Sequence, residues 1–155
     1  MSDFRSCEGC TACCKSLPIQ DLGKPPKVWC KHCDIGVGCR IYSERPKPCR
    51  EFRCQWLMGI GEENDRPDIS KVILDYICHS ENLLGEVMQM WEVSEGALDK
   101  AFLCRTTREI LSCGIWVLHI PLRGGKKLLQ PPNKIVTQDI GDALLREDFI
   151  LVVPG

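Results

Sequence analysis

Cysteine is concentrated near one end of this 155-residue chain. Nine of the twelve cysteines lie within residues 7–54, and they are Cys7, Cys10, Cys13, Cys14, Cys30, Cys33, Cys39, Cys49 and Cys54. Thiolates bind soft and borderline metal ions, and a C-x2-C spacing lets two sulfurs reach one ion with little loss of chain entropy. The density of cysteine therefore predicts an N-terminal module that folds around metal rather than around an apolar core.

The expected compartment decides between metal binding and disulfides. The start of the chain, Met1 to Arg5, has no basic region followed by an apolar stretch, so we expect no secretory signal, and we find no transmembrane segment in the sequence. In a reducing cytoplasm, closely spaced cysteines are more often metal ligands than disulfide partners. The adjacent pair Cys13 and Cys14 would also fit poorly into a disulfide framework. We therefore expect a cytoplasmic, metal-binding protein.

The charges of the chain give no sign of a nucleic-acid partner. Residues 1–58 hold ten Lys or Arg against six Asp or Glu, whereas residues 59–155 hold ten against fifteen. Ionised cysteines would cancel most of the N-terminal excess of positive charge. We therefore expect binding neither to nucleic acid nor to a membrane. The acidic C-terminal part could bind a protein partner.

The pattern of the chain divides it into a cysteine-rich module, residues 1–58, a polar connector, residues 59–66, and a small domain, residues 67–155. In the module, Pro46 and Pro48 exclude a continuous helix through Cys49. Alternating or continuous apolar runs in the small domain predict strands at residues 71–77, 86–93, 115–122 and 126–130. Between the second and third strands, Ser94 and Gly114 have the positions of a helix N-cap and C-terminal glycine, which predicts a helix over residues 95–113.

This order of elements predicts an α+β fold. A metal-stapled, irregular cysteine-rich module would be followed by a small antiparallel sheet with one main helix on one face. The three remaining cysteines, Cys78, Cys104 and Cys113, are expected to be small buried hydrophobes rather than nucleophiles. Cys78 and His79 would point to opposite faces of a strand, so they do not form a thiol–base pair.

The spacing of the clustered cysteines is typical of two kinds of metal site. The run Cys7-x2-Cys10-x2-Cys13-Cys14 offers three thiolates at the spacing that wraps a cubane iron–sulfur cluster, with a fourth ligand to come from further along the chain. Zinc could use the same residues. The second run, Cys30-x2-Cys33-x5-Cys39-x9-Cys49-x4-Cys54, could supply a second tetrahedral site or share ligands with the first.

Other polar residues of the module are weaker candidates. Nine thiols exceed two four-thiolate sites by one, so at least one of them would not be a ligand. His32 could replace a sulfur, although a histidine between two cysteines is more often a solvated neighbour. The positive charges of Arg45, Arg50 and Arg53 could offset the negative charges of the thiolates.

Three segments of the module resemble a known family, the zinc- or iron-chelating domains named from a C-x2-C-x2-C-C motif. They are Cys7-Glu8-Gly9-Cys10-Thr11-Ala12-Cys13-Cys14, Gly38-Cys39-Arg40-Ile41-Tyr42 and Arg45-Pro46-Lys47-Pro48-Cys49-Arg50-Glu51-Phe52. The family is characterised by about eight cysteines that are thought to form a metal site, so the resemblance implies metal chelation without a substrate or a reaction. The motif indicates least clearly whether Cys30, Cys33 and Cys54 are metal ligands.

Three functions follow as expectations. The first is chelation of zinc or of an iron–sulfur cluster by the clustered cysteines, with reaction and substrate unassigned. The second is a metal-shaped module that binds a protein partner. The third is an accessory role in a protein-modifying, methyl-transfer system, because a related group that carries such a motif methylates lysines of flagellin. The chain has no glycine-rich strand-turn-helix signature for a methyl donor's nucleotide.

Overall fold

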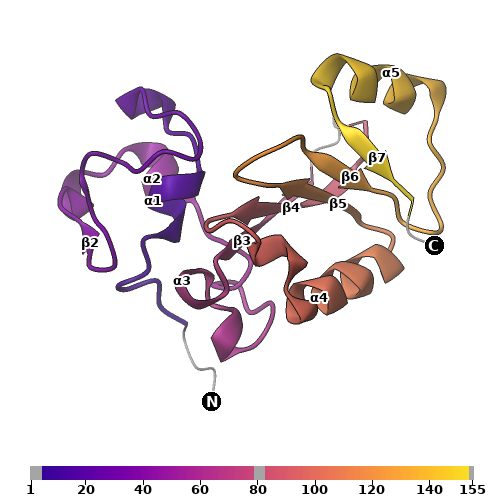
Figure 1. Cartoon of the computed structure of the whole chain (residues 1–155). Coiled ribbons are helices and arrows are strands. Elements are labelled where there is room, and N and C mark those ends of the chain that lie inside the picture. The colour runs from indigo at the N-terminus through magenta and orange to yellow at the C-terminus, as the bar shows by residue number, and fades with distance from the viewer. Residues whose placement is uncertain (1–4, 79–82, 154–155) are drawn as a thin grey trace.

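The computed structural model describes residues 5–78 and 83–153 and has a mixed α+β architecture. Residues 5–58, called the cysteine module below, form one lobe, and a five-stranded sheet with two longer helices forms the other (Figure 1). The prediction that Cys78 and His79 do not form a thiol–base pair lies outside the described residues, because His79 is not among them. The expectation of a mixed α and β fold is confirmed.

The cysteine module contains only short elements. Its helices are α1 (Ala12–Ser16) and α2 (Lys47–Glu51), its 3-10 turns are η1 (Gln20–Leu22) and η2 (Tyr42–Glu44), and its strands are β1 (Cys33–Asp34) and β2 (Gly38–Cys39). The two strands form an antiparallel hairpin in which Cys33 pairs with Cys39. A five-residue helix or a two-residue strand is too short to be stable by itself in water. Other contacts must therefore hold the module together.

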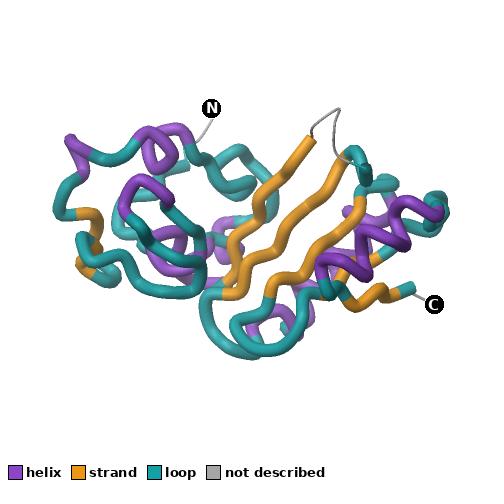
Figure 2. The backbone as a smooth tube through the Cα atoms, turned by 90° about the horizontal axis from the view of Figure 1, so that it is seen from above, coloured by secondary structure: helices purple, strands orange, loops and turns teal. Residues whose placement is uncertain are grey.

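The chain leaves the module through η3 (Glu63–Asp65) and α3 (Pro67–Ser70) and then enters the sheet. The strands are β3 (Val72–Cys78), β4 (Glu86–Glu92), β5 (Trp116–Ile120), β6 (Lys127–Leu129) and β7 (Ile150–Val152). They lie side by side in chain order (Figure 2). β4 pairs with β5 in parallel, as does β6 with β7, whereas the other neighbours are antiparallel. The prediction of an antiparallel sheet is therefore wrong.

Helical crossovers explain the two parallel pairs. Two parallel strands need a connection that returns along the sheet, and a helix commonly provides it. Here α4 (Ala101–Ser112) lies between β4 and β5, and α5 (Gln138–Glu147) lies between β6 and β7. The helix α5 and the strand β7 were not predicted, so the expectation of one main helix is also wrong.

The first crossover helix begins later than the sequence predicts. Ser94 does not cap it, because Gly96 adopts a left-handed conformation and the 3-10 turn η4 (Ala97–Asp99) intervenes. The N-cap is Lys100, which makes no side-chain capping bond. In contrast, Thr137 caps α5, with its hydroxyl accepting a hydrogen bond from the Ile140 amide at 3.4 Å.

The two helices cover opposite faces of the sheet. Leu103 and Leu111 of α4 pack in one buried cluster with Met90 of β4. Ile140 and Leu144 of α5 pack with Trp116 in a cluster on the other face. The cysteine module contacts that second face beside the edge strand β3, where Ala12 packs against Ile73 and Val93. One face of the sheet thus supports both α5 and the cysteine module.

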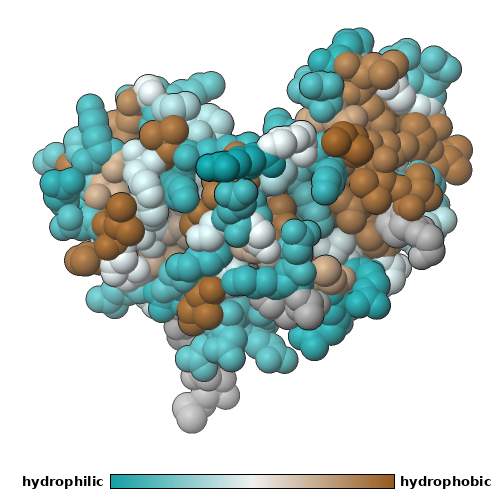
Figure 3. Space-filling view, in the orientation of Figure 1, coloured by the Kyte–Doolittle hydropathy of each residue, from teal (hydrophilic) through white to brown (hydrophobic). Residues whose placement is uncertain are grey.

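The surface shows a contrast between the two lobes. Hydrophilic side chains cover much of the cysteine module, and hydrophobic ones gather over α5 and β7 (Figure 3). The exposed hydrophobic side chains in this second region are Ile135, Leu145, Ile150 and Val153.

The three scattered cysteines are exposed, so the prediction that they are buried is wrong. Cys78 is the last residue of β3, and Cys113 caps the C-terminal end of α4. Cys104 lies on α4 next to the buried Leu103, but its side chain is on the exposed side of the helix. A helix with an apolar stripe leaves the neighbouring positions in water.

The stability of the sheet should depend on pH through His119 of β5. This half-buried imidazole lies 3.4 Å from the Thr107 hydroxyl. Burial lowers the pKa of His119, and the neighbouring Lys127 lowers it further. The unfolded chain therefore binds the proton more readily, so stability should be fully present above pH 6.5 and fall as the pH drops below it. Urea unfolding of wild type and His119→Gln across this range should show a smaller pH dependence in the variant. Equal pH dependence of the two proteins would contradict this assignment.

Candidate functional site

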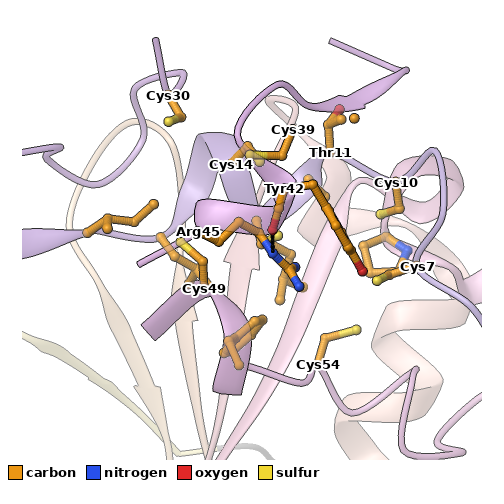
Figure 4. Close-up of a pocket in the computed structure, with 18 of the residues that line it drawn as sticks. Cys7, Cys10, Thr11, Cys14, Cys30, Cys39, Tyr42, Arg45, Cys49 and Cys54 are labelled. Atoms are coloured by element: carbon orange, nitrogen blue, oxygen red, sulfur yellow. Dashed lines mark hydrogen bonds between the residues drawn. The ribbon is translucent and has the colours of Figure 1, made fainter. Parts of the chain in front are cut away.

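Eight of the nine clustered cysteines line one cavity of about 670 Å³ in the cysteine module (Figure 4). They are Cys7, Cys10, Cys13, Cys14, Cys30, Cys39, Cys49 and Cys54. Apolar side chains, including Ile19, Phe52 and Leu57, complete much of the wall. Cys33 does not line the cavity. It is buried behind α1, where its thiol contacts that of Cys14 and the Thr11 hydroxyl.

Hydrogen bonds to the end of β4 hold α1, which carries Cys13 and Cys14, in position. The Lys15 ammonium donates to the Val93 carbonyl at 2.7 Å, and the fully buried Ser16 hydroxyl donates to the Glu92 carbonyl at 3.4 Å. The Cys30 amide in turn donates to the Cys14 carbonyl at 2.9 Å. The rigid sheet therefore fixes the backbone on one side of the cavity.

A second set of contacts positions the N-terminal segment and the segment after Cys54. The Gln55 amide donates to the Leu74 carbonyl of β3 at 2.8 Å. The Arg5 guanidinium donates to the carbonyls of Trp56, Ile60 and Gly61 at 2.7, 3.0 and 2.6 Å. These bonds bring Cys7 and Cys54, which are far apart in the sequence, to the same side of the cavity.

Several of the thiols are protonated more readily than a free cysteine. Burial raises the pKa of Cys49, and the neighbouring thiols of Cys14, Cys30 and Cys39 raise it further. Burial also raises the pKa of Cys33, to about 12. For Cys14 the largest cause of the raised pKa is its hydrogen bond with the Cys13 thiol. Without a cation between them, these thiols stay neutral at physiological pH.

Backbone amides point toward two of the thiols. The Cys10 sulfur accepts a hydrogen bond from the backbone of Ala12, and the Cys54 sulfur accepts hydrogen bonds from the backbone of Trp56 and Leu57. Each of these bonds lowers the pKa of its thiol, although burial raises both pKa values by more. Amide groups directed at sulfur stabilise the thiolate form, and they are typical of the surroundings of metal-bound cysteine.

A buried ammonium group lies behind the other thiols. Lys24 is only 8% exposed, and its Nζ donates to the carbonyls of Lys15 at 3.0 Å, of Pro25 at 3.1 Å and of Leu17. Burial lowers the pKa of Lys24, whereas thiolates at Cys30, Cys14, Cys13 and Cys49 would raise it. Lys24 thus places a positive charge beside thiols that would be negative when they bind metal. The sequence analysis did not identify this residue.

The three arginines expected beside the thiolates differ in position. Arg45 lines the cavity, and its guanidinium lies 3.7 Å from the centre of the Tyr42 ring. It lowers the pKa of Cys49, although burial has the larger, opposite effect. Arg50 and Arg53 are exposed and do not line the cavity. Neither does His32, whose side chain is half-buried beside β1.

The donor chemistry of the cavity suits a thiophilic metal, but the sulfurs do not converge. Within residues 5–78 and 83–153, no three side chains of cysteine, histidine, aspartate or glutamate are close enough to bind one ion. Besides the eight cysteines, Glu8 is the one such side chain among the lining residues. A metal would therefore have to draw thiols inward from the walls of the cavity.

Replacement of Lys24 by methionine should destabilise the cysteine module. The variant Lys24→Met leaves three partly buried carbonyls without their donor, and an unsatisfied buried polar group costs about 1–3 kcal/mol. Urea unfolding, followed by tryptophan fluorescence, should show a loss of about 2 kcal/mol. The matched control is Lys31→Met, because Lys31 is exposed and adjacent to Cys30. Equal stability of the two variants would show that the Lys24 bonds contribute little.

Taken together, the fold and the cavity define a mixed α+β protein with a thiol-lined cavity beside the edge of its sheet. The chain matches no protein-family model, no curated protein and no solved structure. In the described parts of the chain, no helix has the length and apolar character needed to cross a membrane.

Proposed function

We propose that this protein binds zinc or an iron–sulfur cluster through the clustered cysteines of its N-terminal module. The observation that supports the proposal most is that eight cysteines, from five separate segments of the module, line one cavity. Thiolate is a preferred ligand of both zinc and iron–sulfur clusters. A buried zinc would cross-link the segments, whereas a cluster would also be able to accept and release an electron.

The surroundings of the thiols support the same proposal. Metal binding requires thiolates, and their negative charge must be stabilised in a site that is partly shielded from water. The Lys24 ammonium and the amides at Cys10 and Cys54 are arranged to do this. The short helices and strands of the module also need a cross-link, because they bury few apolar side chains of their own.

Elemental analysis of protein purified without oxygen tests this function. We expect either stoichiometric zinc in a colourless protein or iron and acid-labile sulfide in equal amounts in a brown one. The matched control is the double variant Cys104→Ala/Cys113→Ala, which removes two exposed thiols far from the cavity and should keep its full metal content. Protein that contains neither metal nor sulfide, and whose clustered cysteines form disulfides, would contradict the proposal.

A further inference from the structure

Four of the thiols lie on the side of the cavity that faces the sheet. Cys10, Cys13 and Cys54 pack against the buried cluster that contains Ile73. Cys54 has the Cys7 thiol as its electrostatic neighbour, and in Figure 4 Cys7, Cys10 and Cys54 lie together at one end of the view. These four residues are called the sheet-side thiols: Cys7, Cys10, Cys13 and Cys54.

The other four lining thiols lie together at the loops and at α2. Cys49 has the thiols of Cys14, Cys30 and Cys39 as its electrostatic neighbours. The backbone bond from Cys30 to Cys14 holds two of these segments together at 2.9 Å. In Figure 4 they lie in the left and central part of the view. These four residues are called the loop-side thiols: Cys14, Cys30, Cys39 and Cys49.

The adjacent pair Cys13 and Cys14 marks the boundary between the two sets. With 3.6 residues per turn, neighbouring side chains of a helix point about 100° apart, so α1 can direct one thiol toward each set. Figure 4 shows the stacked side chains of Tyr42 and Arg45 between the loop-side thiols and Cys7. The two sets therefore meet at α1, where the thiols of Cys13 and Cys14 contact each other, and the stacked pair lies between their other members.

The two sets also differ in how their negative charge is stabilised. Backbone amides point at the sheet-side thiols Cys10 and Cys54. The Lys24 ammonium is next to three of the loop-side thiols, Cys14, Cys30 and Cys49, and Cys13 is its one neighbour in the other set. The amides therefore stabilise two of the sheet-side thiolates, and the Lys24 charge lies mainly beside the loop-side thiols.

We propose that the cavity holds two separate four-thiolate metal centres, one formed by the sheet-side thiols and one by the loop-side thiols. Each centre takes one thiophilic metal ion or one cluster, and the thiols that bind it release their protons to solvent. Cys33, the ninth clustered cysteine, contacts the Cys14 thiol from outside the cavity lining, and we assign it no metal. This division rests on the metal binding proposed above and assigns the ligands of each centre.

Zinc binding to single-cysteine variants tests the division. Reduced, metal-free protein would be titrated with Zn²⁺ in the absence of oxygen, and native mass spectrometry would count the ions bound per chain. We expect two ions for wild type, one for Cys54→Ala, one for Cys49→Ala and two for the matched control Cys33→Ala. Circular dichroism would verify that the sheet of each variant is folded.

The possible outcomes separate the two proposals. A wild-type protein that binds one ion, or variants Cys54→Ala and Cys49→Ala that each lose all zinc, would overturn the division but not metal binding. Loss of an ion from Cys33→Ala would overturn the exclusion of Cys33. A wild-type protein that binds no zinc, and contains no iron and sulfide when isolated, would overturn metal binding itself.

A second measurement uses only the wild-type chain, so its result does not depend on whether the variants fold. Protein loaded with one equivalent of Zn²⁺ would be treated briefly with N-ethylmaleimide, and tandem mass spectrometry would identify the cysteines that remain unlabelled. We expect protection of one complete set at a time, and labelling of Cys13 and Cys14 to differ within the same molecule. Joint protection of Cys54 and Cys49 at one equivalent would overturn the division.

Discussion

Removal of the metal proposed above is expected to unfold the cysteine module and leave the five-stranded sheet folded. The helices α1 and α2 each have five residues, and most of the buried hydrophobic residues lie outside residues 5–58. At a metal concentration of 100 times the dissociation constant, binding stabilises the folded state by about 2.7 kcal/mol. Chelation should therefore speed amide hydrogen exchange in residues 5–58 by about 100-fold.

Hydrogen-exchange mass spectrometry before and after chelation, in reducing buffer without oxygen, measures this effect. The amides of β5 and β6 serve as the internal control, since both strands lie within the sheet and neither contributes a residue to the lining of the cavity. We expect their exchange to stay slow. If the cysteine module kept its protection after the metal had been removed, its hydrophobic contacts alone would be sufficient to fold it.

Replacement of Trp116 by alanine is expected to cause the largest loss of stability in the sheet. Trp116 is 2% exposed and belongs to the cluster that α5 completes with Ile140 and Leu144. Truncation of a buried tryptophan to alanine costs about 3–5 kcal/mol, because it loses apolar contact and leaves a cavity. Typical domains are stable by about 5–15 kcal/mol, so Trp116→Ala should lose a large part of the total.

Urea unfolding followed by circular dichroism measures the cost of Trp116→Ala. Its control is Leu145→Ala on α5, because Leu145 is 84% exposed and a surface substitution changes stability by no more than about 0.5 kcal/mol. A loss below about 1 kcal/mol in Trp116→Ala would mean that the packing of α5 on the sheet adds little to the stability of the fold.

The strands could be predicted where their sequence pattern is strong. Apolar and β-branched residues predicted strands at residues 71–77 and 86–93, and the structure has β3 at Val72–Cys78 and β4 at Glu86–Glu92. Strand direction could not be predicted, because alternation of side chains is the same in parallel and antiparallel strands. α5 was missed because it follows Pro131 and Pro132 and buries only Ile140 and Leu144.

The candidate site was predicted in composition but not in arrangement. Spacing alone indicated that the nine clustered cysteines belong together, and eight of them line the cavity. Cys33 is outside the lining because it is buried against Cys14 and Thr11, a tertiary contact that the spacing of the cysteines does not reveal. Lys24 was missed because its burial comes from tertiary contacts with Leu17 and Lys15, and nothing in the neighbouring sequence distinguishes it from a surface lysine.

The hydrogen bond from Gln55 to Leu74 places the chain after Cys54 along the free edge of β3. Exposed strand edges are sites at which chains pair with one another and aggregate. The part of β3 that this segment protects includes Val72, Ile73 and Leu74, which are all buried and apolar. If the cysteine module unfolds on loss of metal, as predicted above, this edge of β3 becomes exposed, so loss of metal would also promote association of the folded sheets with each other.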